Sequence, residues 1–332
     1  MRKELYDRIH PELRAEMANA AWIMTEGFIT RANIAERQAA VKQHALQEIA
    51  EAKKNGNPLF DEVSVEEKYI PGLNPGDPEV RILLMRPKAA EGILPGCVAI
   101  HGGGTILCPC ESEQLNFMKF AKLVNCVVVT PDYRLAPQNP YPAGFNDCCA
   151  TLEWLYSNAD ELGVDRSRLA VEGTSAGGLM SAAVCLKARD EGKIKLAAAF
   201  IGSPMLDYRS NSPSVVEMDE ETFPWNGPQN TYAWEMYLNG LDPVPPYASP
   251  AMAEDLSGLP PTIIYSNELD PLRDETIEYA QRLYWAKVPT DLHVFPGCFH
   301  GADIVGANLD ITQRLNDLLY KGMYNLLHKG YF

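Results

Sequence analysis

Long hydrophobic runs are missing from this sequence of 332 residues. The most apolar stretch, around residues 196–205, is far shorter than the roughly 20 residues that a membrane-spanning helix needs. The N-terminus, MRKELYDRIHPELRAEM, is charged and helix-like and has no apolar segment of the kind found in a secretion signal. We therefore expect a soluble, cytoplasmic protein that does not interact with a membrane.

The sequence is also poor in basic residues. It has 29 lysines and arginines against 44 aspartates and glutamates, which gives a formal net charge of −15, and no basic cluster offsets this charge locally. A surface of this sign repels the phosphate groups of nucleic acids. We therefore expect no nucleic-acid partner.

Motifs for metals and nucleotide cofactors are absent too. The eight cysteines are scattered, and no pair at C-x-x-C spacing accompanies a pair of histidines, which argues against a zinc site. Such cysteines are expected to be buried thiols in a reducing compartment. The glycine-rich stretch at residues 101–104 lacks the G-K-[ST] ending of a P-loop and the G-x-G-x-x-G of a dinucleotide fold. We expect neither a metal nor a cofactor.

Short apolar runs alternate with helical stretches along most of the chain. Strands that alternate with helices in this way predict a mostly parallel sheet with helices on both faces. The expected strands are 63–70, 79–86, 97–100, 126–130, 169–172, 196–201, 262–266 and 291–295, and the expected helices are 113–123, 143–162, 176–190, 271–286 and one that ends near 327. The sequence therefore predicts an α/β fold.

Two segments break this alternation. Residues 1–56 show only helical spacing, with one helix after Pro11 and another over residues 33–54. Residues 205–248 are rich in proline, asparagine, tryptophan and tyrosine, and insertions of this kind usually lie over a site. We expect residues 1–56 to form an N-terminal helical cap and residues 57–332 to form the main α/β domain, in which the insertion contributes to the cap.

One serine lies in a conspicuous turn motif. The segment Gly173-Thr-Ser175-Ala-Gly177 connects an expected strand to an expected helix. This G-x-S-x-G pattern is typical of a nucleophile elbow, a sharp turn that exposes a serine hydroxyl and needs small neighbours on either side. The positive end of the helix that begins at Ala176 would face charge that develops near the serine. Ser175 is therefore the candidate nucleophile, and a chance glycine- and serine-rich helix start is the alternative.

A second glycine-rich loop, His101-Gly102-Gly103-Gly104, directly follows an expected strand. Without β-carbons in the way, its backbone can turn N–H groups into a cavity. In an acyl transfer these donors, together with the N–H of Ala176, would bind the negative oxygen of the tetrahedral intermediate. His101 itself is expected to anchor the loop by hydrogen bonds.

The base of such a reaction must come from six histidines. His300 follows the last expected strand, so it lies at the carboxyl edge of the sheet, where ligands bind in open α/β folds. His293 lies within that strand and is expected to be structural. The acid partner should lie between the serine and the histidine in chain order. Asp270, in a loop just past a strand, is preferred, while Glu268 is a lesser candidate and Asp274 is expected to lie in a helix.

Five motifs in this order resemble the hormone-sensitive-lipase-like family of α/β-hydrolases: HGGG, PDYRLAPQNPYPAGFNDC, GTSAGG, ELDPLRDE and FPGCFHG. The resemblance runs from about residue 80 to the C-terminus. It implies an α/β-hydrolase fold with a helical cap, and a small-molecule carboxylesterase that favours short acyl chains and needs no cofactor. It also implies a catalytic triad of Ser175, Asp270 and His300, with oxyanion donors at Gly103, Gly104 and Ala176.

The sequence departs from the family pattern at several positions. Thr174 stands where the commoner GDSAG motif has an acid, and Gln138 stands where many relatives have the glutamate of YRLAPE. HGGG continues as Thr-Ile-Leu rather than with an aromatic residue, and the histidine loop reads FHGAD rather than FHGF. We expect these changes to affect the substrate preference and not the chemistry.

The function that we predict is hydrolysis of short- to medium-chain acyl esters by a Ser-His-Asp acyl-enzyme mechanism. A hydrolase of aryl esters, lactones or amides and an acyltransferase are alternatives on the same triad. A non-catalytic ligand-binding receptor is the least favoured alternative, because the receptors that this fold resembles have lost the histidine that His300 provides here.

The substrate is expected to be a small-molecule ester that binds between the N-terminal cap and the 205–248 insertion. The side chains expected to line this pocket are Met205, Leu206, Tyr208, Phe223, Trp225 and Phe299, although each could equally be ordinary core. An edge strand of the sheet could also pair two copies into a homodimer.

Overall fold

The computed structural model describes residues 2–17, 29–219, 224–305 and 309–332. Within these ranges one sheet carries eight strands in the order β1-β2-β4-β3-β5-β6-β7-β8. The strands are β1 (Val63–Ile70), β2 (Val80–Pro87), β3 (Leu94–Ile100), β4 (Val127–Pro131), β5 (Val164–Thr174), β6 (Ala198–Gly202), β7 (Thr262–Leu269) and β8 (Thr290–Phe299). β2 runs antiparallel to β1 and β4, and every other neighbouring pair is parallel. The predicted α/β fold with a mostly parallel sheet is confirmed.

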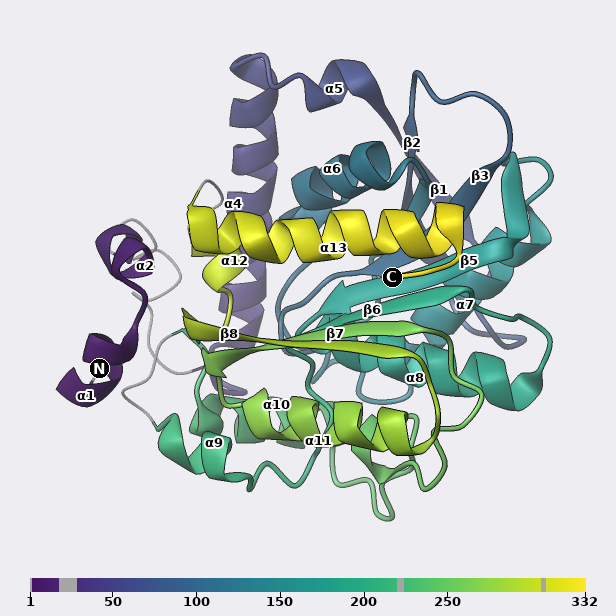
Figure 1. Cartoon of the computed structure of the whole chain (residues 1–332). Helices are drawn as coiled ribbons and strands as arrows, with labels where there is room; N and C mark the ends of the chain where they lie inside the picture. The colour runs from purple at the N-terminus through teal and green to yellow at the C-terminus, as the bar shows by residue number, and fades with distance from the viewer. Residues whose placement is uncertain (1, 18–28, 220–223, 306–308) are drawn as a thin grey trace.

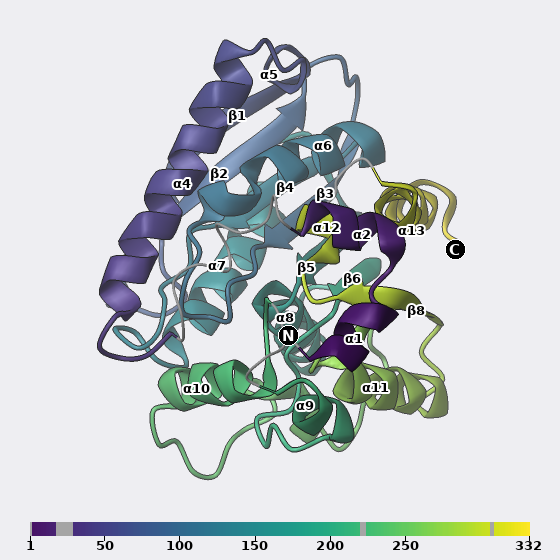
Figure 2. The same cartoon turned by 90° about the vertical axis from the view of Figure 1, so that its left-hand side faces the viewer.

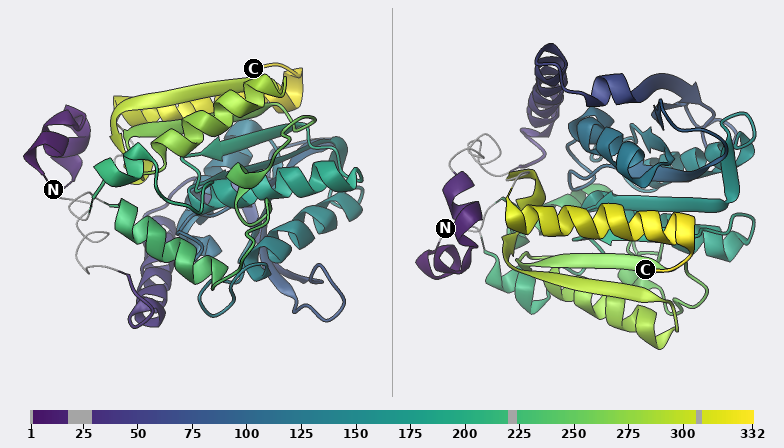
Figure 3. Two further views of the ribbon diagram at one scale, coloured as in Figure 1. Left: turned by 90° about the horizontal axis from the view of Figure 1, so that it is seen from below. Right: turned by 45° about the horizontal axis from the view of Figure 1, so that its top comes forward.

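Helices cover both faces of this sheet (Figures 1 and 3). Those that pack against it are α6 (Gln114–Val124), α7 (Ala143–Ser157), α8 (Ala176–Glu191), α11 (Arg273–Trp285) and α13 (Asp310–Lys329). α6 and α13 share one buried core with the sheet, and α7, α8 and α11 share the other. In the right-hand view of Figure 3, α13 and α11 lie on opposite sides of β7 and β8.

The two layers explain why the central strands are apolar throughout. Every residue of β3 and β4 is buried, because each strand has helices on both of its faces. Cys97 and Ala99 of β3 face the core that contains Phe117 of α6, while Val98 faces the core that contains Leu152 of α7. Alternate residues of one strand therefore serve two separate cores.

Several element ends differ from the sequence prediction; β5, for example, spans Val164–Thr174 rather than residues 169–172. β8 continues to Phe299 rather than ending at residue 295, so it carries the chain directly to His300. The helix expected over residues 143–162 ends at Ser157, where the side-chain amide of Asn158 donates to the Trp154 carbonyl at 2.8 Å. Side-chain bonds of this kind compete with the helix and end it earlier than its apolar pattern suggests.

Further helices, five of them short and one, α4, with 21 residues, gather towards the carboxyl edge of the sheet (Figure 2). They are α1 (Lys3–Arg8), α2 (Pro11–Glu16), α4 (Ile34–Lys54), α9 (Pro213–Glu217), α10 (Gly227–Leu238) and α12 (Ala302–Val305). Of the helix expected after Pro11, positions 18–28 lie outside the described residues. The remaining helical pieces are α5 (Leu59–Glu62) beside β1 and two 3-10 turns, η1 (Cys110–Glu113) and η2 (Pro250–Met252).

Hydrogen bonds tie the N-terminal segment to this edge. The side chain of Gln38 on α4 donates to the Ile106 carbonyl at 2.8 Å, just beyond the HGGG loop. The N–H of Ile29 donates to the side chain of Gln229 on α10 at 2.8 Å. The N-terminal segment thus contacts the chain just after the HGGG loop and the 205–248 insertion, and that it forms a cap stays a prediction. No helix in the described ranges is both long and apolar enough to span a membrane.

Candidate active site

Ser175 occupies the tight turn between β5 and α8. Its φ is +62° and its ψ is −122°, a combination that non-glycine residues rarely adopt. The Ser175 N–H donates to the Gly202 carbonyl at 2.8 Å, which ties the turn to the end of β6. A β-carbon at position 177 would overlap the carbonyl oxygen of Ile100, so only glycine fits there. The structure thus contains the strand–turn–helix that the sequence predicts.

Three side chains from separate loops meet at this turn. His300 Nε2 lies 2.9 Å from Ser175 Oγ, and His300 Nδ1 lies 2.8 Å from Asp270 Oδ2. Asp270 is fully buried, and its other oxygen accepts the N–H of Leu272 at 2.9 Å. Because an ionised carboxylate can only accept, Nδ1 carries a hydrogen, and Nε2 is left to accept the serine proton. The structure brings together the three residues predicted from the sequence.

The electrostatic surroundings favour the protonated form of His300. Burial lowers the pKa of this imidazole, but the charge of Asp270 and its hydrogen bond outweigh burial, and the pKa lies above its ordinary value. Asp303, on α12, adds to the increase through its own negative charge. The histidine is therefore well suited to hold a proton taken from the serine.

Asn267 fixes the loop that carries His300, and the sequence analysis did not find it. This residue is fully buried near the end of β7, and its amide donates to the Phe299 carbonyl at 3.0 Å and to Ser203 Oγ at 3.3 Å. It thus connects the ends of three strands beside the histidine. The expected strand ends at residue 266, one position before this asparagine, so the sequence contains no clear signal that its amide is buried and needs partners.

The HGGG loop lies beside Ser175 with two backbone donors unused. Among the described residues, neither the N–H of Gly103 nor the N–H of Gly104 has a hydrogen-bond acceptor. The loop is held by its carbonyls: Tyr133 Oη donates to the His101 carbonyl at 3.0 Å, and His101 Nδ1 donates to the Gly102 carbonyl at 2.9 Å. The rings of His101 and Tyr133 stack with centroids 4.1 Å apart. His101 thus contacts the loop as an anchor would.

Two carboxylates bind backbone N–H groups of this loop and of the segment that contains Tyr133. Asp147 is buried and accepts the backbone N–H of Arg134 at 2.8 Å together with two guanidinium N–H groups, which holds the segment that contains Tyr133. Glu113, at the end of η1, accepts the N–H of Gly102 at 2.6 Å. The sequence analysis identified the first of these segments only as a family motif, and it did not identify Glu113.

Trp225 lies against the glycine loop on its open side. A β-carbon on Gly104 would come within 2.6 Å of the indole ring, and the centroids of the indole and the His300 imidazole are 6.2 Å apart. The indole N–H donates to Asn230 Oδ1 at 3.2 Å, which fixes the ring from α10. Trp225 therefore lies close to both the glycine loop and the histidine, and that it contacts a substrate stays a prediction.

The other predicted pocket residues take different positions. The backbone N–H of Met205 donates to the Ser175 carbonyl at 3.2 Å, but the side chains of Met205, Leu206 and Phe299 are buried in the two cores. Tyr208 is partly buried, and Phe223 lies outside the described residues. That these side chains contact a substrate stays a prediction.

The competing acids and the structural histidine have other partners. Glu268 forms an ion pair with Arg8 at 2.9 Å, and Asp274 lies in the first turn of α11, as expected. His293 lies on β8 with Asp291 2.9 Å away. These contacts leave Asp270 as the carboxylate that is bonded to the imidazole of His300.

One group of side chains has the donor set of a metal site. Cys110, Glu111 and Asp132 place their ligand atoms within 4.8 Å of one another. The guanidinium of Arg81 lies among them, 2.6 Å from Glu111 and 3.1 Å from Asp132. A cation is thus already present as a side chain, and we assign no metal to this group.

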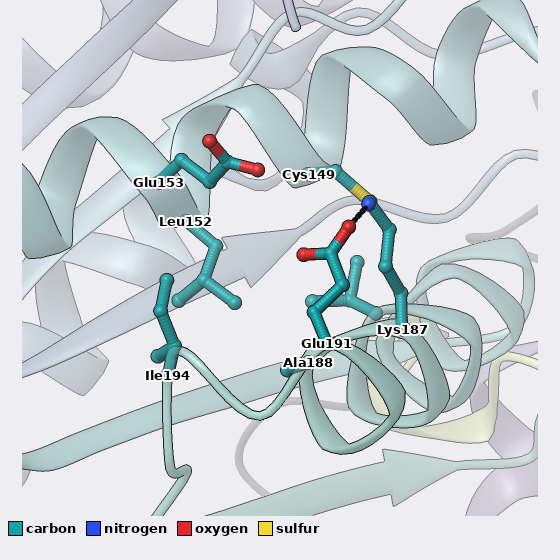
Figure 4. Close-up of a pocket in the computed structure, with 8 residues that line it drawn as sticks. Cys149, Leu152, Glu153, Lys187, Ala188, Glu191 and Ile194 are labelled. Atoms are coloured by element: carbon teal, nitrogen blue, oxygen red, sulfur yellow. Dashed lines mark hydrogen bonds and ion pairs between the residues drawn. The ribbon is translucent and has the colours of Figure 1, made fainter.

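A small surface depression lies between α7 and α8, at the end of α8 remote from Ser175 (Figure 4). Its floor is apolar and includes Leu152 and Ile194, and Lys187 and Glu191 form an ion pair on its rim. Burial raises the pKa of the Cys149 thiol beside it, which keeps the sulfur protonated. Nothing in the depression carries the chemistry of the Ser175 site.

A buried Asp–His–Ser hydrogen-bond chain at the carboxyl edge of a mostly parallel sheet defines the α/β-hydrolase class. Comparison with known proteins agrees. A family described as alpha/beta hydrolase fold matches residues 97–304. The carboxylesterase NlhH of Mycobacterium tuberculosis is 37% identical over 266 residues, which cover 77% of this chain and 82% of that protein.

Solved structures extend the similarity to nearly the whole chain. A bacterial heroin esterase is 36% identical with a TM-score of 0.86 and covers 97% of this chain and 99% of its own. The esterase LipW from Mycobacterium marinum is 31% identical with a TM-score of 0.86 and covers 97% of each chain. The chain belongs to the α/β-hydrolase family and, within it, to the hormone-sensitive-lipase-like group. This confirms the predicted family and the prediction of a carboxylic-ester hydrolase.

The charge of Asp303 gives a testable pH dependence. Because this carboxylate raises the pKa of His300, Asp303→Asn is expected to lower it. A base works only when it is unprotonated, so the acidic limb of the kcat/KM profile should move to lower pH. The measurement is kcat/KM for a short ester across the acid range. Asp317→Asn, on an exposed part of α13, is the control and should leave the limb in place. A limb that stays fixed or moves to higher pH in the Asp303 variant would contradict the assignment.

Proposed function

We propose that the protein is a carboxylesterase that uses Ser175 as its nucleophile, His300 as its base and Asp270 as the partner of the base. The observation that carries the proposal is the position of the imidazole, within hydrogen-bond distance of both the serine hydroxyl and the buried carboxylate. In the first step Ser175 Oγ attacks the ester carbonyl while its proton moves to His300 Nε2. Asp270 keeps the imidazole oriented and stabilises its positive charge, without taking the proton itself.

Collapse of the tetrahedral intermediate breaks the ester bond. The alcohol leaves with the proton from His300, and the acyl group stays on Ser175. Water then attacks the acyl-enzyme, gives its proton to the same imidazole, and releases the acid as the proton returns to the serine. We assign the negative oxygen of both intermediates to the N–H groups of Gly103, Gly104 and Ala176. The two unused donors of the loop and the first N–H of α8 support this assignment.

The proposed substrate class rests on the position of Trp225 beside the triad. Trp225 fills the space over Gly104, and the surrounding side chains belong to the tightly packed core. An indole at this position leaves little room for a long acyl chain, which supports small-molecule esters with short to medium acyl chains as the substrates. Residues 1–56 and 205–248 act as the cap over it, which the bonds of Gln38 and Ile29 support.

A cytoplasmic location and a homodimer are also part of the proposal. All eight cysteines are free and seven of them are buried, which suits a reducing compartment. β8 is an edge strand, and Val294 on it is 41% exposed. Trp285, on the neighbouring α11, is 70% exposed. Open edge strands readily pair with a second chain. Fractionation of cells that produce the protein would test the location.

The nucleophile is tested with p-nitrophenyl acetate, butyrate, octanoate and palmitate. The wild-type protein should hydrolyse the short esters fastest, and Ser175→Ala should lose at least about 10⁴-fold in kcat, because no other group can form the acyl-enzyme. Circular dichroism checks that the variant is folded. Retention of wild-type turnover by the variant would reject the mechanism, and turnover that increases up to palmitate would reject the short-chain preference.

The variant Trp225→Ala tests whether the indole limits the length of the acyl group. Removal of the indole opens space over Gly104, so the ratio of kcat/KM for octanoate to that for acetate should rise by about tenfold or more. Trp285→Ala removes a tryptophan that is 70% exposed and serves as the control. An unchanged ratio in the Trp225 variant would show that this side chain does not limit the acyl group.

The homodimer is tested by sedimentation velocity. Wild-type protein should sediment with the mass of two chains, and Val294→Lys should shift it to one, because a buried lysine at the paired edge is costly. Ile93→Lys, at a highly exposed position on a loop before β3, is the control. A wild-type protein that sediments as one chain at high concentration would exclude the dimer.

A further inference from the structure

Glu113 makes a short contact to the loop beside the nucleophile. Its carboxylate accepts the N–H of Gly102 at 2.6 Å. A β-carbon built on Gly102 would lie 3.4 Å from that carboxylate oxygen and 3.5 Å from the β-carbon of Ser175. The carboxylate and the reacting serine therefore both lie close to the first glycine of the loop.

The surroundings of Glu113 make an ion-pair role untenable. Among the residues that the structure describes, no lysine or arginine pairs with it, and Gly102 is the partner of its carboxylate. Burial, with a smaller contribution from the charge of Asp303, raises the pKa of Glu113 to about 7, although the bond from Gly102 acts in the opposite direction. A carboxylate in such a place costs folding free energy, and groups of this kind are concentrated at functional sites.

The contact complements the other supports of the loop. Tyr133 and His101 hold carbonyl oxygens of residues 101 and 102, and the Gly103 carbonyl accepts the N–H groups of Ile106 and Leu107. Glu113 holds an N–H instead. With both sides of the peptide between residues 101 and 102 bonded, its plane cannot rotate, and the direction of the next two N–H groups is set.

We propose that Glu113 is a positioning residue of the oxyanion loop, which holds the N–H of Gly102 so that the N–H groups of Gly103 and Gly104 face the oxygen of the tetrahedral intermediate. This inference rests on the proposed function, since the role of those two donors belongs to it. The bond between Glu113 and Gly102 should stabilise the tetrahedral intermediate more than the bound ester. The N–H groups that it orients bind most strongly to an oxygen that carries negative charge. Loss of the bond should therefore lower kcat and leave KM nearly unchanged.

The test compares three replacements of Glu113. Glu113→Gln keeps an acceptor oxygen at the same distance and removes the charge. Glu113→Ala removes the acceptor, and Glu113→Asp keeps the charge but withdraws the acceptor by about one bond length, roughly 1.5 Å. With p-nitrophenyl acetate we expect the alanine and aspartate variants to lose about 10- to 100-fold in kcat with KM within about threefold, and the glutamine variant to stay within about threefold in both.

The inhibition constant of a tetrahedral inhibitor distinguishes the proposed positioning role of Glu113 from a purely structural role, which would leave this constant unchanged. The inhibition constant of a trifluoromethyl ketone, which places an oxyanion in the loop, should rise in the alanine variant by the same factor as kcat/KM falls. Asp255→Ala is the matched control, because Asp255 accepts the backbone N–H of Ser257 at 2.7 Å in a loop outside the site. It should change neither constant. If the alanine variant does not fold, the aspartate variant carries the comparison.

Labelling of Ser175 by a fluorophosphonate separates this inference from the proposed function, because it needs the loop but no ester substrate. Slower labelling in the alanine and aspartate variants, with a normal rate in the glutamine variant, would support the inference even if no ester is hydrolysed. Equal rates of labelling in all folded variants would overturn it. Equal losses in the glutamine and alanine variants would also overturn it, since they would assign the effect to the charge and not to the bond.

Discussion

The turn at Ser175 holds a residue with a β-carbon at φ +62°, and the rest of the site is arranged around this strained backbone. Conformations of this kind cost about 1–3 kcal/mol and persist only where the surroundings determine them. Here the carbonyl of Gly202 accepts the Ser175 N–H, and the N–H of Met205 donates back to the Ser175 carbonyl. The end of β6 and the residues just after it therefore hold the turn through both the N–H and the carbonyl of Ser175. The same geometry places the N-terminus of α8 behind the hydroxyl.

The carboxyl edge of the sheet then determines which groups can reach that hydroxyl. Parallel strands bring the loops after β3, β5, β7 and β8 to one edge, so the glycine loop, the serine, the acid and the histidine lie together although they are far apart in the sequence. The final positions are set by polar bonds between those loops. Asn267 ties the end of β7 to Phe299 beside the histidine, and Tyr133 ties the segment after β4 to the glycine loop. The fold brings these loops close together, and the polar bonds between them fix the final positions of the side chains.

This division explains what the sequence could and could not predict. Ser175, Asp270 and His300 follow from local patterns, a strand followed by a turn, together with their chain order. The strands β1 and β2, the central parallel strands and most helices also follow, because their apolar patterns are local, whereas the antiparallel pairing of β1 with β2 is seen only in the structure. The end of β8 does not, since the register with β7 extends it to Phe299 beyond its apolar run.

Supporting residues are harder to predict because their partners are defined only in the folded chain. Asn267 and Phe299 are 32 positions apart, and Glu113 in the sequence is one of several acids in a polar segment before a helix. Its contact with Gly102 exists only because η1 returns the chain to the glycine loop. Composition and periodicity contain no signal for such a contact, and the burial of the Asn267 amide, which requires partners, is likewise seen only in the folded chain.

The departure at Thr174 can be understood from the charges around the nucleophile. Asp270, Glu113 and Asp303 already place three carboxylates around the serine and the histidine, and the pKa of Glu113 is raised to about 7 by its burial. A fourth carboxylate at position 174, as in GDSAG, would repel these and the oxyanion. Thr174 instead offers a neutral hydroxyl that is bonded to the buried side chain of Tyr265. The side chain at position 174 thus keeps a hydrogen bond without adding a further negative charge to the turn that carries Ser175.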